Sequence, residues 1–249
     1  MISTERELYA LSPRATPRWA QIARRLARAT RAAWRLRELR HLTRPEQSIE
    51  EIVDAVFTFS GGFFVPLQIK SEVVAFLRMV EQARPKAVIE IGTERGGTLF
   101  LLSRVAAPDA TIISVDLPGG PWGGGYSYGR VPFYRAFRWA SQKFHFVRAD
   151  SHQIRSLDRV RKLLPDGQCD LCLIDGDHSY EGAKQDFAMY GSLVRSAGLV
   201  AFHDIVKHAA RYRAGVDRLW AELKLTHRHV ELVEDWGQGS CGIGVVIRD

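Results

Sequence analysis

From residue 87 onward, the chain alternates short apolar runs with segments long enough to form helices. No other feature of the sequence limits the choice of fold so strongly. Strands that are each followed by a helix form βαβ units, and such units build a parallel sheet covered by helices on both faces. We therefore predict five strands: Ala87 to Ile91, Thr111 to Asp116, Phe144 to Ala149, Asp170 to Asp175 and Leu199 to His203.

The segment before the first strand has a helical pattern with one interruption. Helices are predicted over residues 48–56 and 67–82, separated by the aromatic and glycine-rich stretch 57–66. The phenylalanines of that stretch either close a ligand pocket or belong to the core. They are Phe57, Phe59, Phe63 and Phe64.

The positive charge of the chain is concentrated near its start. Residues 1–50 carry eleven Arg and five Glu, a net +6 of the total +7, which leaves +1 for residues 51–249. Residues 19–34 fit one amphipathic helix with arginines on its polar face. We expect this basic extension to pack on its own domain or on a second subunit. The alternative is contact with an anionic membrane surface. Nucleic-acid binding is not expected, because the remainder is nearly neutral and has no binding motif.

Two further features bear on location and redox chemistry. No apolar stretch approaches the roughly 18 residues of a membrane span, and no signal peptide is recognisable, so we expect a cytoplasmic protein. Of the three cysteines, Cys169 and Cys172 have the spacing of a zinc knuckle but lie in an apolar run without a second ligand pair. A packing role is the better prediction for them.

Polar residues stand at the carboxyl end of every predicted strand. Because parallel strands end at one edge of a sheet, these residues should line a common crevice, and ligands bind at that edge in open α/β folds. A single acid after a strand would usually cap a helix, but five strand ends in series favour a site. The residues are Glu90 with the loop Gly92 to Thr98, Asp116, Asp150, Asp175, and His203 with Asp204.

The glycine-rich loop after the first strand limits the type of cofactor. Gly92, Gly96 and Gly97 allow a ligand close to the backbone, and Asp116 is placed to accept hydrogen bonds from a ribose diol. The dinucleotide motif GxGxxG is absent, since Glu94 occupies its second glycine position. Glu90 and Glu94 would repel a pyrophosphate. A cofactor with a positive centre and no phosphate, such as S-adenosylmethionine, fits better.

The motifs VIEIGTERGGT, SVD, RADS, LIDGDHSYEGAKQDF and GLVAFHDI occur in this order from residue 88 to residue 205. Together they resemble the class I S-adenosylmethionine-dependent methyltransferases, in particular the cephalosporin-hydroxylase-like branch and the metal-dependent sugar O-methyltransferases. The resemblance implies a Rossmann-like, doubly wound sheet of seven strands, mostly parallel with an antiparallel last strand, following an N-terminal helical extension. Residues 1–50 would form the extension and residues 51–249 the methyltransferase domain. HVELVED and GIGVVIRD would form the closing hairpin.

The resemblance also assigns roles to residues at the strand ends. Gly92 and its neighbours Glu90, Thr93, Gly96 and Gly97 would hold the methionine part of the cofactor. Asp116 would bind the ribose, Asp150 and Ser151 the adenine, and Asp175 would lie beside the cofactor.

Asp175 and Asp204 end neighbouring predicted strands, about 5 Å apart, and are near enough to share a divalent ion. Oxygen ligands favour Mg²⁺ or a similar ion. The metal-dependent relatives have an acidic pair after the fifth strand, but here His203 replaces its first acid. His203 either coordinates, which would shift the preference toward Mn²⁺, Fe²⁺ or Ni²⁺, or only lines the site. Asp177 is either a further ligand or the cap of the helix that follows it, and we expect the cap.

His178 is the candidate general base, because its near-neutral pKa suits proton transfer and relatives have a histidine there. A metal would bind a substrate hydroxyl and lower its pKa, and His178 would accept the proton. The alternative is a helix-start residue bonded to a carboxylate.

The glycine-rich loop 117–130 suits a mobile lid that stacks on a sugar, with Trp122, Tyr126 and Tyr128 exposed. We expect an O-methyltransferase acting on a sugar or polyol hydroxyl. The alternatives are a metal-dependent oxidative enzyme and a non-catalytic cofactor-binding or membrane-associated scaffold. A homo-oligomer is compatible with each.

Overall fold

The structure is a computed structural model that describes residues 35, 37–39, 42, 47–120, 125–209 and 213–249. The chain divides into two compact units, Met1–His41 and Leu42–Asp249. The amphipathic helix predicted over residues 19–34 lies outside the described residues, as does Trp122. The sheet and the candidate site belong to the second unit.

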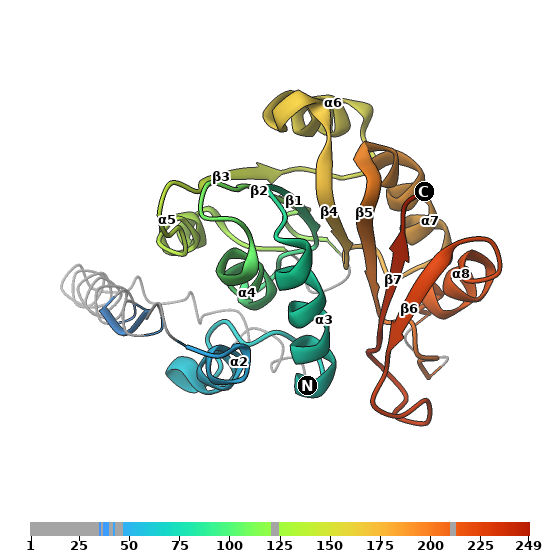
Figure 1. The fold of residues 1–249 in the computed structure, drawn as a ribbon, viewed down its shortest axis with the longest axis horizontal. Helices are drawn as coiled ribbons and strands as arrows, with labels where there is room; N and C mark the ends of the chain where they lie inside the picture. Colours follow the sequence, from blue (N-terminus) through green and yellow to red (C-terminus); the bar gives the residue numbers. More distant parts are fainter. Residues whose placement is uncertain (1–34, 36, 40–41, 43–46, 121–124, 210–212) are drawn as a thin grey trace, which may run out of the picture. The chain divides into compact units, whose positions relative to one another are not determined.

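The described residues form one sheet of seven strands in the order β3-β2-β1-β4-β5-β7-β6 (Figure 1). Neighbouring strands from β3 to β5 pair in parallel, and β7 pairs antiparallel with both β5 and β6. This arrangement confirms the predicted Rossmann-like sheet and its antiparallel last strand. The strands are β1 (Ala87–Ile91), β2 (Thr111–Asp116), β3 (Lys143–Arg148), β4 (Cys169–Ile174), β5 (Val194–His203), β6 (Arg228–Leu232) and β7 (Ile243–Ile247).

Helices cover both faces of the sheet. The helices are α2 (Ile49–Thr58), α3 (Lys70–Ala83), α4 (Gly97–Val105), α5 (Val131–Arg135), α6 (Ile154–Leu163), α7 (Tyr180–Tyr190) and α8 (Val216–Leu223). Side chains of α6, α7 and α8 join those of the central strands in one buried cluster, and α3 and α4 lie on the opposite side of the sheet in Figure 1. Short 3₁₀ turns occur at Phe59–Gly61, Tyr128–Arg130, Pro165–Gly167 and Gly191–Leu193. The central strands are buried on both faces, and β1 is buried over its whole length.

The start of α2 is fixed by a capping box. The Ser48 hydroxyl accepts a hydrogen bond from the Glu51 amide, and the Glu51 carboxylate accepts one from the Ser48 amide. This reciprocal pair satisfies amides that have no partner inside the helix. The helix predicted over residues 48–56 is therefore confirmed.

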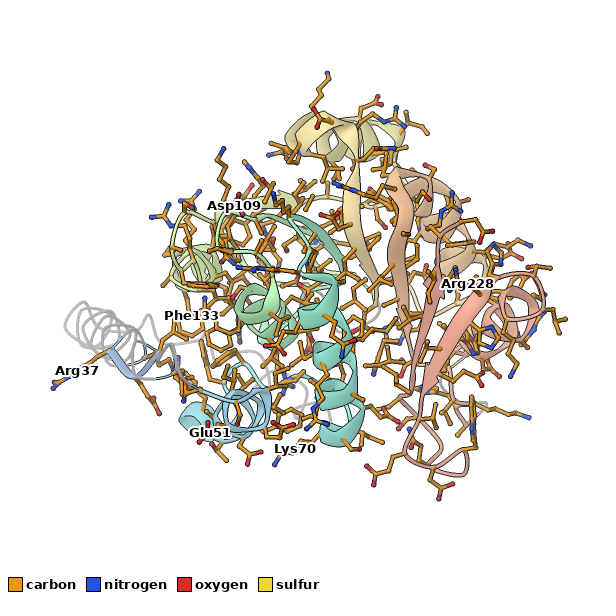
Figure 2. All side chains as sticks on the ribbon, viewed as in Figure 1. Arg37, Glu51, Lys70, Asp109, Phe133 and Arg228 are labelled. Atoms are coloured by element: carbon orange, nitrogen blue, oxygen red, sulfur yellow. The ribbon has the colours of Figure 1, made fainter. Side chains whose placement is uncertain are left out.

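Two phenylalanines between α2 and α3, Phe59 and Phe64, belong to the core. Phe59 and Phe64 are almost completely buried, and their rings meet edge to face with centroids 4.6 Å apart. Phe64 also packs against Phe100 of α4 and Phe137, while Phe133 of α5 is buried beside them. The charged side chains labelled in Figure 2, such as those of Lys70 and Asp109, are exposed by contrast. The core interpretation thus holds for Phe59 and Phe64.

One buried acid of α3 holds the loop between β6 and β7. The Glu72 carboxylate accepts hydrogen bonds from the amides of Glu234 and Gly242, at 3.1 and 2.9 Å, and from the side chain of Gln238 at 2.8 Å. Its exposed fraction is 2%. The hairpin is thereby attached to a helix that lies far earlier in the sequence.

The strand register aligns the carboxyl ends of the central strands. Ile91 of β1 pairs with Val115 of β2 and with Ile174 of β4, and Ile174 pairs with Phe202 of β5. The residues that follow these paired positions therefore lie at one edge of the sheet. His203, which follows Phe202, lies beside Asp175, which follows Ile174. The strand order reverses between β1 and β4, which is where open α/β sheets bind ligands.

Strand β5 begins five residues before the predicted Leu199, at Val194. Its first part contains three exposed residues, and the register to β4 shifts between Cys169 and Leu171. The polar sequence Arg195 to Gly198 hid this part of the strand from the apolar pattern. Cys169 and Cys172 of β4 are fully buried, as expected for a packing role, and burial raises the pKa of the Cys169 thiol to about 12.

Candidate active site

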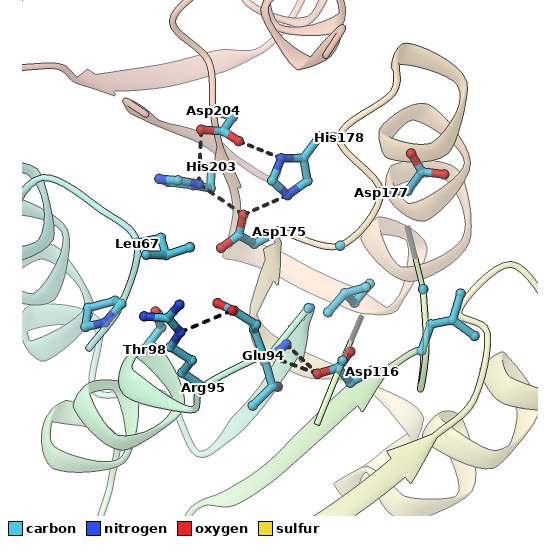
Figure 3. A pocket seen from close by; sticks show the side chains of 18 of the residues that line it. Leu67, Glu94, Arg95, Thr98, Asp116, Asp175, Asp177, His178, His203 and Asp204 are labelled. Carbon is cyan, nitrogen blue, oxygen red and sulfur yellow. Dashed lines mark hydrogen bonds and ion pairs between the residues drawn. The ribbon is translucent and has the colours of Figure 1, made fainter. Parts of the chain in front are cut away.

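The carboxyl ends of β1, β2, β4 and β5 open into one cavity of about 880 Å³ (Figure 3). Ligand sites typically have volumes of roughly 300 to 1,000 Å³. The predicted cofactor residues Gly92, Thr93, Gly96, Gly97, Asp116, Asp150, Ser151 and Asp175 line it. So do His178, His203 and Asp204.

Glu90 is the predicted cofactor residue that does not line the cavity. Its side chain is fully buried under the loop after β1 and accepts a hydrogen bond from the Thr93 hydroxyl. That hydroxyl lies 2.7 Å from Ser114 Oγ, which in turn lies 3.1 Å from the hydroxyl of Tyr126. Burial raises the pKa of Glu90 well above its usual value, and the charge of Asp175 adds to the effect. Glu90 supports the loop from below, and its contact with a cofactor stays a prediction.

Gly92 is required by the packing of two strand ends. Its φ is +86°, and a Cβ at this position would lie 2.0 Å from the carbonyl oxygen of Asp175. The Gly92 amide donates to Val115 O at 2.9 Å, and the Asp175 amide donates to Ile91 O at 2.8 Å. Only glycine allows β1 and β4 to end so close together.

Asp116 binds the backbone of the same loop. Its Oδ2 accepts hydrogen bonds from the amides of Thr93 and Glu94, at 3.2 and 2.9 Å, and the amides of Leu117 and Tyr126 also donate to the carboxylate. Burial raises the pKa of Asp116, and these four amides oppose the rise. The carboxylate therefore joins the end of β2 to the glycine loop. Its predicted contact with a ribose would add to this role.

Asp150 begins the turn after β3. Its carboxylate accepts hydrogen bonds from the His152 amide at 2.9 Å and from the Gln153 side chain at 3.0 Å. These bonds lower the pKa of Asp150 although burial acts in the opposite direction. The His152 ring lies 3.4 Å from the buried carboxylate of Asp186. Asp150 and Ser151 are thus placed together at the cavity, as the sequence predicted.

His178 lies between the two carboxylates that follow β4 and β5 (Figure 3). Its Nδ1 is 2.7 Å from Asp204 Oδ2, and its Nε2 is 3.6 Å from Asp175 Oδ1. Burial alone would lower the pKa of His178, but the hydrogen bond to Asp204 and the charge of Asp175 outweigh it and raise that pKa. The loop between β4 and α7 therefore brings the predicted base to the predicted metal ligands.

His203 is the most buried of the site histidines, with an exposed fraction of 5%. Its Nδ1 lies 3.0 Å from Asp175 Oδ1 and 3.3 Å from Asp204 Oδ1. Burial opposes protonation, but the two carboxylates raise the pKa of His203 well above its usual value. Asp204, at a φ of +64°, has a pKa far below its usual range, because the charge of His203 and hydrogen bonds from His178 and His208 outweigh its burial.

The helix after His178 is capped by Ser179, which corrects the prediction that Asp177 is the cap. The Ser179 hydroxyl accepts a hydrogen bond from the Gly182 amide at 3.0 Å, and α7 begins at Tyr180. Asp177 instead accepts a hydrogen bond from the Ser179 amide at 2.9 Å and so shapes the turn before the cap. Asp177 and Ser179 each have a side-chain oxygen that can cap a helix, so the sequence alone did not determine which of the two residues is the cap.

Tyr126 is buried, which corrects the prediction of an exposed aromatic in the loop after β2. Its exposed fraction is 2%, whereas that of Tyr128 is 78%. The Arg148 guanidinium lies 3.7 Å from the centroid of the Tyr128 ring and donates to Tyr126 O at 3.1 Å. This part of the predicted lid is therefore bound to β3.

Two lining residues were missed by the sequence patterns. His208 Nε2 lies 3.0 Å from Asp204 Oδ1, and the Cys241 amide donates to the same oxygen at 3.1 Å. Neither residue stands directly at the end of a predicted parallel strand. His208 lies in the loop after β5, and Cys241 precedes β7, whose antiparallel pairing returns its start to the site.

The arrangement suits a divalent cation. Among the described residues, Asp175, His178 and Asp204 form one group with ligand atoms within 4.8 Å of one another, and His203, Asp204 and Cys241 form another. Carboxylate oxygens and imidazole nitrogens are common metal ligands. The residues present therefore fit an ion at the end of β4 and β5.

The seven-stranded sheet order and the cavity at its switch point are those of a Rossmann-like methyltransferase fold. Residues 89–205, a little under half of the chain, match the family model described as "Methyltransferase domain". The matched segment runs from β1 through β5 and ends just after Asp204.

Solved structures with the same fold include several O-methyltransferases. The O-methyltransferase from Bacillus cereus, in complex with SAH, has a TM-score of 0.56 at 15% identity, covering 82% of this chain and 92% of that chain. TomG from Streptomyces achromogenes, an O-methyltransferase involved in tomaymycin synthesis and solved with SAM, has a TM-score of 0.51 at 16% identity, covering 82% and 91%. At such identities the likeness establishes the fold.

A curated relative, the uncharacterized protein y4gI of Sinorhizobium fredii, is 30% identical over 149 residues. The match covers 58% of this chain but only 16% of that protein, so the chain spans about a sixth of its relative's length. In the described part of the chain, every helix is too short or too polar to cross a membrane.

Proposed function

We propose that the protein is an S-adenosylmethionine-dependent O-methyltransferase that acts, with a divalent cation, on a hydroxyl of a sugar or polyol. The observation that carries the proposal is the convergence of His178, Asp175 and Asp204 at a cavity that the glycine loop also lines. O-methyltransferases among the structural neighbours, two of them solved with SAH or SAM, support the choice of cofactor and acceptor atom.

The cavity residues suit a cationic cofactor. Glu94, Asp116, Asp150 and Asp175 line it, and Arg95 is paired with Glu94 at 3.2 Å. A sulfonium would be attracted by these carboxylates, whereas a pyrophosphate would be repelled. This charge distribution favours S-adenosylmethionine over a dinucleotide.

Bound in this cavity, S-adenosylmethionine would supply an electrophilic methyl group, and a divalent cation held by Asp175, His203 and Asp204 would lower the pKa of the acceptor hydroxyl. His178 would receive the hydroxyl proton. Asp204 at 2.7 Å binds its Nδ1, which leaves Nε2 as the acceptor in the neutral form. Alignment of acceptor and methyl group would provide much of the acceleration, since displacement at carbon needs little further chemistry.

The test is calorimetric titration of the purified protein with S-adenosylmethionine and, separately, with NAD, each with and without Mg²⁺. We expect binding of the first and none of the second. Methyl transfer from labelled cofactor to a panel of sugars and polyols then tests the acceptor class, and we expect it to stop with chelator. Binding of NAD alone, or oxygen consumption without methyl transfer, would contradict the proposal and favour an oxidative enzyme.

Asp175→Asn provides the matched test of the site. This change keeps the shape of the side chain and removes its charge, so we expect loss of methyl transfer with the fold retained. The control is Asp158→Asn on the exposed surface of α6. Deletion of residues 1–45 tests whether the basic segment carries the function. We expect the truncated protein to retain methyl transfer. If the truncated protein lost both methyl transfer and vesicle binding, a scaffold that acts through the basic segment would be favoured.

A further inference from the structure

The ring of His203 is held in the orientation of a metal ligand. Its Nδ1 lies within 3.0 Å of Asp175 Oδ1, while its Nε2 is buried and has no hydrogen-bond partner among the described residues. Histidines that bind metals almost always donate the other ring N–H to a carboxylate, a backbone carbonyl or water, which fixes the tautomer and directs the free nitrogen at the ion. A buried ring nitrogen without a partner is otherwise costly.

Cys241 places a thiol near the His203 ring. A ring nitrogen of His203, a carboxylate oxygen of Asp204 and Sγ of Cys241 lie within 4.8 Å of one another, and the thiol interacts with the His203 ring. Since Nδ1 contacts the two carboxylates, we infer that Nε2 is the nitrogen that would share an ion with Cys241. Zn–S and Zn–N bonds measure about 2.3 and 2.1 Å, so two ligands of one ion lie within about 4.4 Å of each other. A small side-chain movement suffices to bring the three atoms to such distances.

The backbone holds Cys241 in this place. Its amide donates to Asp204 Oδ1 at 3.1 Å, and the neighbouring amide of Gly242 donates to the buried Glu72 carboxylate at 2.9 Å. Cys241 and Asp204 both have a positive φ, of +64° each. Non-glycine residues in this conformation are strained and concentrate at functional sites.

We propose that His203, Asp204 and Cys241 bind a thiophilic first-row transition-metal ion of the zinc, cobalt or ferrous type rather than Mg²⁺. Thiolate and imidazole ligands favour these ions, and Mg²⁺ requires oxygen ligands. The inference rests on the proposed function in one respect, because it names the ion of the same cavity. The protein's side of the cavity would then provide one sulfur, one nitrogen and one oxygen ligand. Asp175, which the proposed function counts as a ligand, would instead orient the His203 ring through Nδ1.

The same three residue types, with Asp175 behind the histidine, also resemble a cysteine–histidine–aspartate nucleophile. The position of Asp204 favours the ion. Its Oδ1 lies 3.3 Å from His203 Nδ1 and its carboxylate belongs to the same group as the thiol, so it supplies a third ligand that a nucleophilic cysteine does not need. The experiment separates the two.

The test titrates the full-length, chelator-treated protein with Co²⁺ as a spectroscopic probe and with Zn²⁺ in equilibrium dialysis. We expect one ion per chain, a thiolate-to-cobalt charge-transfer band in the near ultraviolet, and no displacement by excess Mg²⁺. Cys241→Ser should abolish the band and weaken Zn²⁺ binding about tenfold or more. The matched control is Cys169→Ala, which removes a fully buried thiol of β4 and should leave both readouts unchanged.

A measurement on the unaltered protein covers the case in which Cys241→Ser fails to fold. Cys241 is partly exposed and the two other cysteines are buried, so iodoacetamide should modify Cys241 first, and Zn²⁺ should protect it. An ion bound without the charge-transfer band, absence of ion binding, or alkylation that Zn²⁺ does not slow would each overturn the inference. S-adenosylmethionine binding, measured by calorimetry on the chelated protein, reports separately on the proposed function and does not depend on these outcomes.

Discussion

The close approach of two strand ends requires glycine at position 92. Replacing it with alanine would impose a positive φ on a residue with a Cβ and would also place that atom 2.0 Å from Asp175 O. We expect Gly92→Ala to lower the free energy of unfolding by about 3 kcal/mol or more, the sum of backbone strain and overpacking. Urea denaturation measures the change.

Gly119→Ala is the matched control for this prediction. Gly119 has a similar φ of +73°, but a Cβ there would meet nothing within 4 Å. The loss should be about 1 to 2 kcal/mol from backbone strain alone. Equal losses for the two variants would show that the approach of Asp175 is not what selects Gly92.

His152 should make stability depend on pH. The buried carboxylate of Asp186, 3.4 Å from the ring, is the main reason why the pKa of His152 is raised, and burial acts against it. A raised pKa in the folded state stabilises the protein fully below the unfolded value of about 6.5, and this contribution is lost as the pH rises through the folded value. Thermal melts between pH 6 and pH 9 should therefore show a larger fall in Tm for the unaltered protein than for His152→Gln. Parallel pH profiles would contradict this.

The residues of the site were predictable where the chain repeats a simple rule. Asp116, Asp175 and Asp204 each stand at the end of an apolar strand, and parallel pairing brings their positions to one edge. Cys241 was not predictable in this way, because it precedes an antiparallel strand, and neither was His208, which lies within a loop. Contacts of those two residues depend on tertiary structure that no local pattern encodes.

At the scale of elements, the N-cap of α7 links stability to the site. Ser179→Ala removes the hydroxyl that accepts the Gly182 amide, and should lower the free energy of unfolding by about 1 kcal/mol. Because the cap follows His178 directly, we also expect slower methyl transfer. Ser48→Ala removes the equivalent cap of α2 and should cost a similar free energy without slowing turnover. Equal turnover in Ser179→Ala and Ser48→Ala would show that the cap of α7 does not contribute to the function of His178.

The helices and strands were predictable to within a few residues, with one instructive exception. Thr111 to Asp116 and Ala87 to Ile91 match the observed strands at both ends because both are buried throughout. The early part of β5 escaped prediction because Arg195, Ser196 and Ala197 are exposed there. A pattern of apolar residues indicates buried strands, so it does not detect the start of β5, which is exposed.

At the scale of the whole molecule, cofactor binding should be visible as stability. A ligand that binds only the folded state adds about 2.7 kcal/mol at a concentration 100 times its Kd. We therefore expect S-adenosylmethionine to raise the Tm, and NAD at the same concentration to leave it unchanged. Differential scanning fluorimetry checks both, and a shift with NAD alone would contradict the assignment of the cavity.

The topology of the sheet was predictable because alternating strands and helices leave few arrangements. Right-handed crossovers and a single reversal suffice to produce the observed order up to β5. The position of the β6–β7 hairpin depends instead on the pairing of β7 with β5 and on the contacts of Glu72, which are long-range.

The attachment of that hairpin to Glu72 also orders events during protein synthesis. The ribosome completes Glu72 and the five parallel strands before Cys241 and β7 emerge. A nascent chain that has β1 through β5 would still have an open edge on β5 and an incomplete wall beside Asp204. The cavity would therefore close only after β7 has been synthesised and has paired with β5.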